Sequence, residues 1–360
     1  MDAVNSKPSD ANMILVMGVT GSGKSFLINQ LAGKEVVVES AQLESSRSRK
    51  VSDQVLGTAV CQAVPIEIGR TKVLLIDTPG FDDSKRTDVD ILMEISKLLT
   101  AQYQLGVSLK GIIYLHRITD NRYQGSSVRT LDIFNEICGE RALKNVILAS
   151  TRWDKVDEQE GAARETQLRE KFWSYMLDHG SKMTRYHGDR ESAHAMISQL
   201  LGSGNVILDI QRQLVDEGKT LDETSAGAFV NGNISEAIKK SNAEIEILQR
   251  KLGESNNAMK QKLEEDKKRE EAIARQARRD QVSLRTNVGQ DVQDEMNVEM
   301  GRRKKRSKRM GIIMPLLPAA LSILEMFIGL PIGASDLFSS WILGEEGDGG
   351  LFNQFSELFA

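Results

Sequence analysis

The chain has 360 residues, 40% of them hydrophobic and 27% charged, which is enough for one large domain with appendages or for two domains. A formal net charge of −4 argues against a nucleic-acid-binding surface over the whole chain. Two cysteines, Cys61 and Cys138, are too few for a disulfide framework, and the polar start MDAVNSKPSD lacks the apolar core of a signal peptide. We therefore expect a cytoplasmic protein from a reducing compartment, with a disordered N-terminus over residues 1–11.

Short apolar runs alternate with helix-like segments over residues 12–205. The runs cover residues 14–17, 73–76, 112–115 and 146–149. Each is rich in Val, Ile or Leu, which is typical of strands buried on both faces. A further strand, pairing antiparallel, is expected over residues 61–68. The pattern predicts an α/β domain, a doubly wound and mostly parallel sheet with helices on both sides.

The first motif, GVTGSGKS at residues 18–25, fits G-x-x-x-x-G-K-[ST] between a predicted strand and a predicted helix. Such P-loops wrap a phosphate chain with backbone N–H groups and aim a helix N-terminus at it. Lys24 would reach the β- and γ-phosphates, and the Ser25 hydroxyl would bind Mg²⁺. The predicted nucleotide-binding stretch is Gly18, Val19, Thr20, Gly21, Ser22, Gly23, Lys24, Ser25 and Phe26. The alternative is a chance glycine-rich turn, and the loop alone does not specify the base.

The second motif is IDTPGFDD at residues 76–83. Asp77 ends an apolar strand, at the edge where ligands bind in open α/β sheets, and its carboxylate can hold Mg²⁺ through water. Gly80 lets a backbone N–H approach a γ-phosphate. The alternative is an ordinary strand followed by a Pro-Gly turn.

The third motif, ASTRWDKVD at residues 149–157, selects the base. A carboxylate beyond this strand can accept hydrogen bonds from N1–H and the 2-amino group of guanine, whereas adenine would leave it unpaired. We assign this role to Asp154, with Thr151 and Arg152 beside the base, and Asp157 remains a rival. The alternative for Asp154 is a solvated loop charge.

The order of these motifs resembles that of GTPase G domains. In detail, GVTGSGKSFLINQLAG, IDTPGFDD, ILASTRWDKV and GIIYLHRITDNRYQGSSVRTLDIFNEICG resemble the septin-like branch, particularly the immunity-associated (GIMAP or IAN) GTPases and their uncharacterised fungal relatives. The resemblance covers roughly residues 12–201. It implies a P-loop GTPase that binds GTP and GDP with Mg²⁺.

The resemblance also implies a switch I threonine, here Thr58, whose hydroxyl would bind Mg²⁺ and whose backbone would bind the γ-phosphate. Lys24, Thr58 and Gly80 would then serve hydrolysis, and Ser25, Thr58 and Asp77 would hold the metal. The base-capping loop falls at RYHGDRESA, without an identifiable contact residue. Phe81 stands where Ras-like enzymes carry a water-orienting glutamine, so we expect slow hydrolysis or stimulation by a partner.

The family's dependence on partners goes with dimerisation across the nucleotide face. His116 and Arg117 could contribute to hydrolysis in cis or in trans, and a structural role is the alternative for His116.

The remainder of the chain is read as a helix and loop extension at 206–233 and a long helix or coiled coil at 234–300. Ile238, Ile245, Leu252 and Met259 recur every seven residues, which resembles a coiled-coil seam, although a solvated single helix fits as well. Oligomerisation through the G domain or the coiled coil is expected.

A basic run at 301–309, an apolar segment at 310–334 and an amphipathic tail at 335–360 complete the sequence. The apolar segment is long enough to reach across a bilayer, but Pro315, Pro318, Pro331 and Glu325 count against a straight spanning helix. Membrane association next to anionic lipid is expected, with docking on protein as the alternative. For the basic run, a nuclear-localisation or nucleic-acid patch and a solvated charge run are alternatives.

The sequence therefore predicts a Mg²⁺-dependent GTP-binding switch with low turnover. A GTP-sensing oligomeric scaffold and an ATPase are the alternatives, and no nucleic-acid partner is expected.

Overall fold

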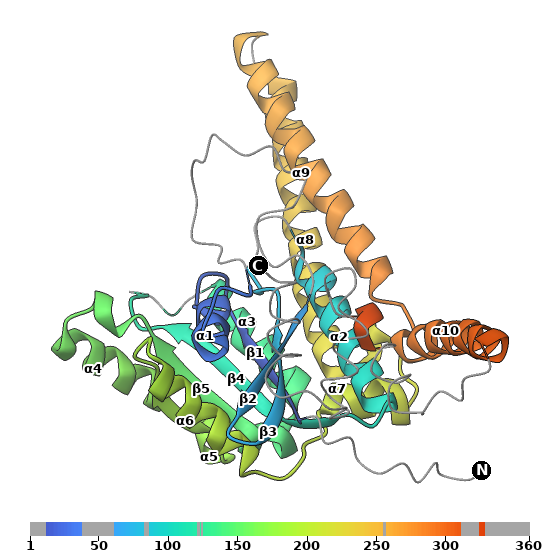
Figure 1. Cartoon of the computed structure of the whole chain (residues 1–360). Helices are drawn as coiled ribbons and strands as arrows, with labels where there is room; N and C mark the ends of the chain where they lie inside the picture. Colours follow the sequence, from blue (N-terminus) through green and yellow to red (C-terminus); the bar gives the residue numbers. More distant parts are fainter. Residues whose placement is uncertain are drawn as a thin grey trace, which may run out of the picture.

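The computed structural model describes residues 12–37, 61–82, 86–120, 123, 125–254, 257–310 and 324–327. At its centre lies a six-stranded sheet in the order β2-β3-β1-β4-β5-β6 (Figure 1). Its strands are β1 (Asn12–Gly18), β2 (Gln62–Ile68), β3 (Thr71–Asp77), β4 (Ser108–Arg117), β5 (Val146–Thr151) and β6 (Lys182–Arg185). Only β2 pairs antiparallel; the other neighbours run parallel. The predicted mostly parallel sheet is confirmed, and β6 is a strand that the apolar runs did not indicate.

Each face of the sheet has its own hydrophobic core. Successive side chains of a strand point to opposite faces, so Met13, Leu15 and Met17 enter one core while Ile14 and Val16 enter the other. Helices α1 (Lys24–Ala32) and α6 (Arg190–Leu201) cover the second core. The first core is covered by α2 (Asp88–Gln104), α3 (Ser126–Cys138) and shorter segments. These are η1 (Glu140–Asn145), η2 (Trp153–Lys155), the π-helical η3 (Leu168–Phe172) and α5 (Ser174–Asp178), while α4 (Glu158–Gln167) leads directly into η3.

Helix α2 begins a few residues after the second motif. Its first turn is closed by a capping box, in which the Thr87 hydroxyl accepts from Asp90 N at 3.2 Å and the Asp90 carboxylate accepts from Thr87 N at 3.1 Å. This pairing satisfies backbone donors that the helix itself leaves open. Val89, Ile95 and Leu99 are among the apolar residues that α2 buries. Helix α2 thus begins close after the second motif and packs its apolar face on the core.

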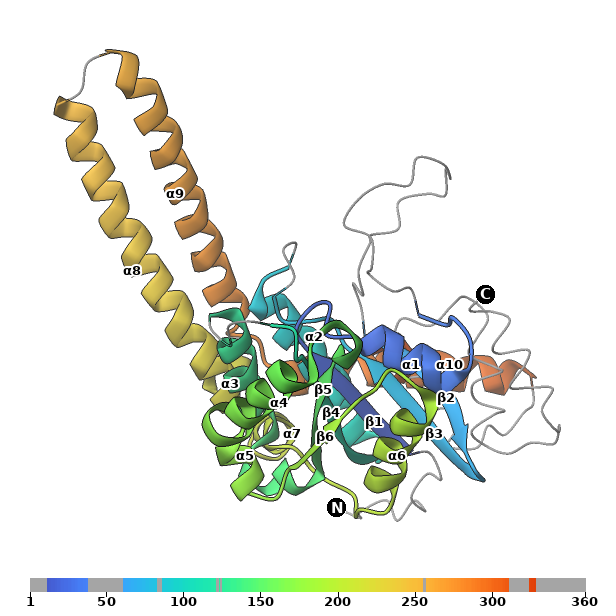
Figure 2. The ribbon, with the colours of Figure 1, turned by 90° about the vertical axis from the view of Figure 1, so that its left-hand side faces the viewer.

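Residues 234–300 form separate helices where one long helix was expected. The elements beyond residue 205 are α7 (Asp209–Gln211), η4 (Arg212–Asp216), η5 (Leu221–Glu223), α8 (Ser225–Glu254), α9 (Asn257–Ser283) and α10 (Val288–Met310), and the last three divide residues 234–300. Helices α8 and α9 lie side by side as a hairpin that projects from the domain (Figures 1 and 2). Gly253, next to the last residue of α8, favours helix less than the residues before it, which is consistent with the end of α8 at Glu254.

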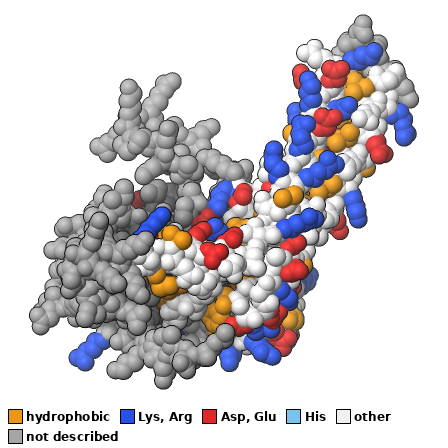
Figure 3. All heavy atoms as spheres, turned by 90° about the vertical axis from the view of Figure 1, so that its right-hand side faces the viewer, with side chains coloured by type: hydrophobic (Ala, Val, Ile, Leu, Met, Phe, Trp, Pro, Cys, Tyr) orange, Lys and Arg blue, Asp and Glu red, His pale blue; other side chains and the backbone are white. Residues whose placement is uncertain are grey.

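The hairpin buries only a narrow seam between its two helices. Leu248 of α8 and Ala274 of α9 are buried, whereas Ile247, Met259 and Ile273 are exposed. Figure 3 shows Lys, Arg, Asp and Glu side chains along the hairpin, with hydrophobic side chains between them. The apolar repeat therefore has a partner helix within the same chain, and a coiled coil between chains remains a prediction.

Helices beyond residue 205 contribute side chains to the core on the α2 face of the sheet. Leu284, Val288 and Val292 are fully buried in the core that α2 covers. Helix α10 lies along α2, where Gln104 Nε2 donates to the Gly289 carbonyl at 3.3 Å. The α10 backbone continues through the basic run to Met310.

The predicted apolar segment lies outside the described residues, apart from Met310 and residues 324–327. In this short stretch, which includes η6 (Glu325–Phe327), Leu324 is fully buried and Phe327 is nearly so. Both side chains belong to the core beside α2. Within the described part of the chain, no helix is both long enough and apolar enough to cross a membrane. The N-terminal residues 1–11 and the tail 335–360 also lie outside the described residues.

Candidate nucleotide-binding site

The P-loop connects the end of β1 to the start of α1. Gly18, Gly21 and Gly23 have φ angles of 141°, 77° and 97°, a backbone region that favours glycine. Lys24 is the first residue of α1 and is only 7% exposed. Its ammonium donates to the carbonyls of Gly18 and Val19, each at 3.1 Å. The loop therefore curls around a buried positive charge.

Neighbouring strands hold the P-loop in place. The Thr151 hydroxyl at the end of β5 donates to the Ser22 carbonyl at 2.9 Å. Gly80, after β3, lies so close that an added Cβ would be 2.6 Å from Thr20 N. Only glycine fits there without displacing the loop. The ends of three motifs predicted from sequence thus meet at one edge of the sheet.

A hydroxyl and a carboxylate lie together at the start of α1. Ser25 Oγ donates to Asp77 Oδ2 at 2.8 Å, and Asp77 is fully buried. Oxygen ligands of this kind suit Mg²⁺, which keeps several waters and binds substrate phosphates besides one or two protein groups. No cluster of three His, Cys, Asp or Glu side chains that could hold a metal occurs among the described residues. Ser25 and Asp77 fit a Mg²⁺ ion whose remaining ligands come from a nucleotide and water.

The residues after Gly80 turn toward the protein interior. Phe81 is buried in the core and cannot orient a water molecule. Asp82 has a positive φ of 96°, and its carboxylate accepts a hydrogen bond from the Ser126 hydroxyl at 3.1 Å. This bond links the second motif to the first residue of α3. Thr58, the predicted switch I residue, lies outside the described residues.

The third motif places its two candidate carboxylates in different settings. Arg152 has a left-handed conformation with φ 65° and leads into η2. Asp154 in η2 is largely exposed and lies 3.2 Å from Lys155 Nζ. Asp157, its rival, caps α4 by accepting from Gln159 N at 2.9 Å. Because Asp157 already has a structural role, the geometry favours Asp154 as the carboxylate for a base.

The loop after β6 is a further part of the site for which the sequence named no contact residue. Tyr186 N donates to the Ser150 carbonyl at 2.8 Å, which holds the loop against the end of β5. The rings of Tyr186 and Phe26 lie 6.4 Å apart, and an added Cβ on Gly188 would lie 3.6 Å from the Phe26 ring. The segment RYHGDRESA therefore lies beside the first turn of α1 and the third motif. The feature of the sequence that could have indicated this loop is Gly188, which directly precedes Asp189, the N-cap residue of α6.

The position of His116 supports the structural alternative over a role in hydrolysis. Its side chain is nearly completely buried, with ring centroids 4.6 Å from Tyr123 and 6.3 Å from Trp173. These rings belong to the core on the face of the sheet opposite α1. Burial, with a smaller effect from Arg117, lowers the pKa of His116 to about 3, so the imidazole is neutral near pH 7.

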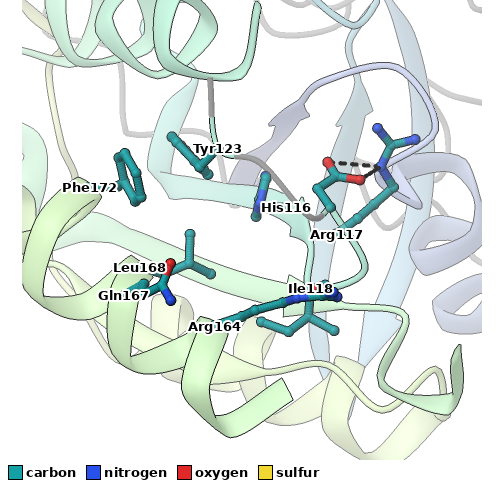
Figure 4. Close-up of a pocket in the computed structure, with 9 residues that line it drawn as sticks. His116, Arg117, Ile118, Tyr123, Arg164, Gln167, Leu168 and Phe172 are labelled. Carbon is teal, nitrogen blue, oxygen red and sulfur yellow. Dashed lines mark hydrogen bonds and ion pairs between the residues drawn. The ribbon is translucent and has the colours of Figure 1, made fainter. Parts of the chain in front are cut away.

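A small pocket of about 30 Å³ lies beside His116, with room for about one or two waters. It is lined by His116, Arg117, Ile118, Asp120, Tyr123, Arg164, Gln167, Leu168 and Phe172 (Figure 4). His116 Nδ1 has no hydrogen-bond partner among the described residues. In Figure 4, His116 points into this pocket, whereas Arg117 extends the other way, toward the P-loop.

Comparison with known proteins agrees with this geometry. Residues 12–174 match the model of the AIG1 family. These residues have the fold of a P-loop GTPase G domain, and we call this matched part of the chain the AIG1-type domain. The AIG1-type domain contains the three motifs, and the match ends before β6 and the helices that follow.

Individual relatives match the AIG1-type domain only in part. GTPase Era of Erythrobacter litoralis is 34% identical over 86 residues, which is 24% of this chain and 26% of that protein. The Translocase of chloroplast 34 homolog of Chlamydomonas reinhardtii is 27% identical over 152 residues, 41% of this chain and 36% of that protein. The chain thus spans between about a quarter and about a third of the length of these relatives.

Among solved structures, Toc33 of Arabidopsis thaliana in complex with GDP and Mg²⁺ is 15% identical, with a TM-score of 0.42. The match covers 56% of this chain and 88% of that one. At this level the similarity carries no argument about activity.

Proposed function

We propose that this chain is a GTP-binding protein, a Mg²⁺-dependent nucleotide switch built on its AIG1-type domain. The observation that carries the proposal is the meeting of three motifs at one sheet edge, with the Thr151 hydroxyl on the Ser22 carbonyl and Ser25 on Asp77. A phosphate loop, a metal-binding pair and a base-selecting carboxylate then lie along one ligand. The relatives named as a GTPase and as a chloroplast translocase support the proposal without extending their activities to this chain.

In this proposal the phosphates lie over the P-loop, at the N-terminus of α1. Lys24 contributes its charge, and Ser25 and Asp77 hold the metal. A Mg²⁺ ion held by these two residues would supply positive charge to offset that of the phosphates. Asp154 accepts the guanine N–H groups. The loop near Tyr186 then covers the base, because it lies against β5 and Phe26.

Base choice is tested by competition on the full chain. A fluorescent GTP analogue is displaced with GTP or ATP, in Mg²⁺ and again in EDTA. The proposal predicts displacement by GTP at least tenfold better than by ATP, and weaker binding in EDTA. Equal displacement by both nucleotides would support the ATPase alternative.

We also propose that GTP hydrolysis is slow and rises with dimerisation across the nucleotide face. Buried Phe81 supports slow turnover, because the position after Gly80 offers no water-orienting group. A dimerisation-deficient mutant of Toc33 has been solved, and dimerisation is important for the GTPase activity of the chloroplast translocon components atToc33 and psToc159. Single-turnover hydrolysis is measured at several protein concentrations. A rate constant independent of concentration contradicts the dimer, and a very low rate with GTP-dependent assembly favours a scaffold.

For the C-terminus we propose attachment to an anionic membrane through the basic end of α10 and the apolar residues beyond it. Helix α10 extends past the core and ends in the run RRKKRSKR. The buried Leu324 and Phe327 support the competing alternative, docking on α2, for that part of the segment. Cells expressing the full chain, or a version ending at Glu299, are fractionated and washed in alkaline carbonate. A full chain that fractionates like the truncated one contradicts membrane attachment.

A further inference from the structure

The P-loop has a second positive charge beside it, to which none of the motifs assigns a role. Arg117 is the last residue of β4. Its Nη1 atom lies 3.1 Å from the position that a Cβ on Gly21 would take. The guanidinium therefore packs directly on the fourth residue of the P-loop. Figure 4 shows the side chain leaving the pocket that His116 enters and reaching toward this loop.

The direction of this guanidinium is fixed by an ion pair. Arg117 Nε lies 3.0 Å from Asp120 Oδ1 and 3.2 Å from Oδ2. The backbone also turns back here, since Asp120 N donates to the Arg117 carbonyl at 3.3 Å. Ile118 N donates to the Thr151 carbonyl at 2.9 Å, which ties this turn to the strand that braces Ser22. Asp120 occupies the Nε side of the guanidinium, and Nη1 is directed at the loop.

We propose that Arg117 is a positioning residue of the phosphate site, which holds Gly21 in place and adds its charge to that of Lys24 beside the phosphate chain. The inference rests on the proposed nucleotide function. A brace without charge would stabilise the empty loop and affect every bound nucleotide equally. A cation beside the loop acts more strongly on ligands with more phosphates, because the attraction grows with the charge of the ligand. The number of phosphates therefore separates the two roles.

The test compares Arg117→Gln with Arg117→Lys in the full chain. Affinities for GMP, GDP and GTP are measured by calorimetry in Mg²⁺ at low salt. For Arg117→Gln we expect at least a tenfold loss for GTP, a smaller loss for GDP and the smallest for GMP. Arg117→Lys restores most of the difference between the nucleotides, because it keeps the charge. Asp120→Asn gives an intermediate loss, since the guanidinium is no longer aimed.

Arg212 provides a matched control. It pairs with Asp209, also three residues away, at 3.2 Å and with similar exposure, but in η4 and far from the P-loop in sequence and contacts. Arg212→Gln should leave all three affinities unchanged. Thermal unfolding of each variant shows that it is folded.

An equal loss for GMP, GDP and GTP, or no loss at all, overturns the inference and leaves the proposed function standing. A loss that Arg117→Lys fails to reduce also overturns it. If the unmodified chain binds none of the three nucleotides, the proposed function fails and the inference fails with it.

Discussion

The hydrogen bond between Thr151 and Ser22 joins the end of β5 to the P-loop, and its removal is a direct test of this architecture. The donor and acceptor are 2.9 Å apart, Thr151 is 3% exposed and Ser22 is fully buried. Thr151→Val keeps the volume but leaves the Ser22 carbonyl without this donor. Losing a partner inside the protein costs roughly 1–3 kcal/mol. We expect the free energy of unfolding to fall by that amount.

Urea unfolding with and without GTP measures the effect. Because the bond positions the P-loop, we also expect weaker nucleotide binding, so that GTP stabilises Thr151→Val less than the unmodified chain. Thr151→Ser is the matched control, since it keeps the hydroxyl and loses only the methyl group. If Thr151→Val stays within about 0.5 kcal/mol of the unmodified chain while Thr151→Ser is more destabilised, the methyl packing matters and the reasoning is refuted.

Three further predictions follow from the burial of single side chains. Lys24→Ala removes an ammonium bound to two loop carbonyls, and we expect at least a tenfold loss of GTP affinity. A loss within about threefold, which is under 1 kcal/mol, contradicts the P-loop assignment. Since burial lowers the pKa of His116 to about 3, only the unfolded chain binds this proton between about pH 6.5 and 3. The stabilising contribution of neutral His116 is therefore complete above about pH 6.5 and is lost within that range at up to roughly 1.4 kcal/mol per pH unit. His116→Asn should reduce this slope in urea titrations at several pH values. The double variant Leu324→Ala/Phe327→Ala should lower the free energy of unfolding by at least about 2 kcal/mol. The side chain of Met326 is 47% exposed, so Met326→Ala should leave this free energy unchanged. Equal effects of the two variants contradict docking on the core.

The central sheet could be predicted from sequence because its strands are buried on both faces. β1 and β5 contain continuous apolar runs, which are typical of parallel strands covered by helices on both faces. β6 could not be found this way. It consists of Lys182–Arg185, a short edge strand whose residues are exposed or half-buried, and it is held by pairing with β5. Such a strand forms because of its pairing with a neighbouring strand, and the local sequence pattern does not contain this information.

The site was predictable where glycine and charge have fixed spacing, and less so where contacts are long-range. The P-loop and Asp77 follow from motif and strand position alone. The choice between Asp154 and Asp157 depends on which carboxylate caps α4, which the spacing does not reveal. The role proposed for Arg117 depends on its approach to Gly21, nearly 100 positions earlier in the chain.

The heptad pattern did not identify the partner of the helix: Ile238, Ile245 and Leu252 of α8 are half-buried, and Met259 is exposed on α9. A seven-residue repeat is equally satisfied by a helix of the same chain or of another. Here α9 packs against α8. The same limit applies to the apolar segment, because hydrophobicity alone does not distinguish a bilayer from the α2 surface where Leu324 lies.

The most direct test of GTP recognition exchanges one carboxylate for an amide. Asp154→Asn replaces a pair of acceptors with one donor and one acceptor, which complements xanthine better than guanine. Asp157→Asn is the matched control, since Asn caps a helix as well as Asp does and this residue caps α4. Affinities for GTP and XTP are measured for both variants. The account predicts that Asp154→Asn loses GTP and gains XTP, while Asp157→Asn behaves like the unmodified chain. Unchanged GTP affinity in Asp154→Asn, with loss of GTP in Asp157→Asn, would contradict it.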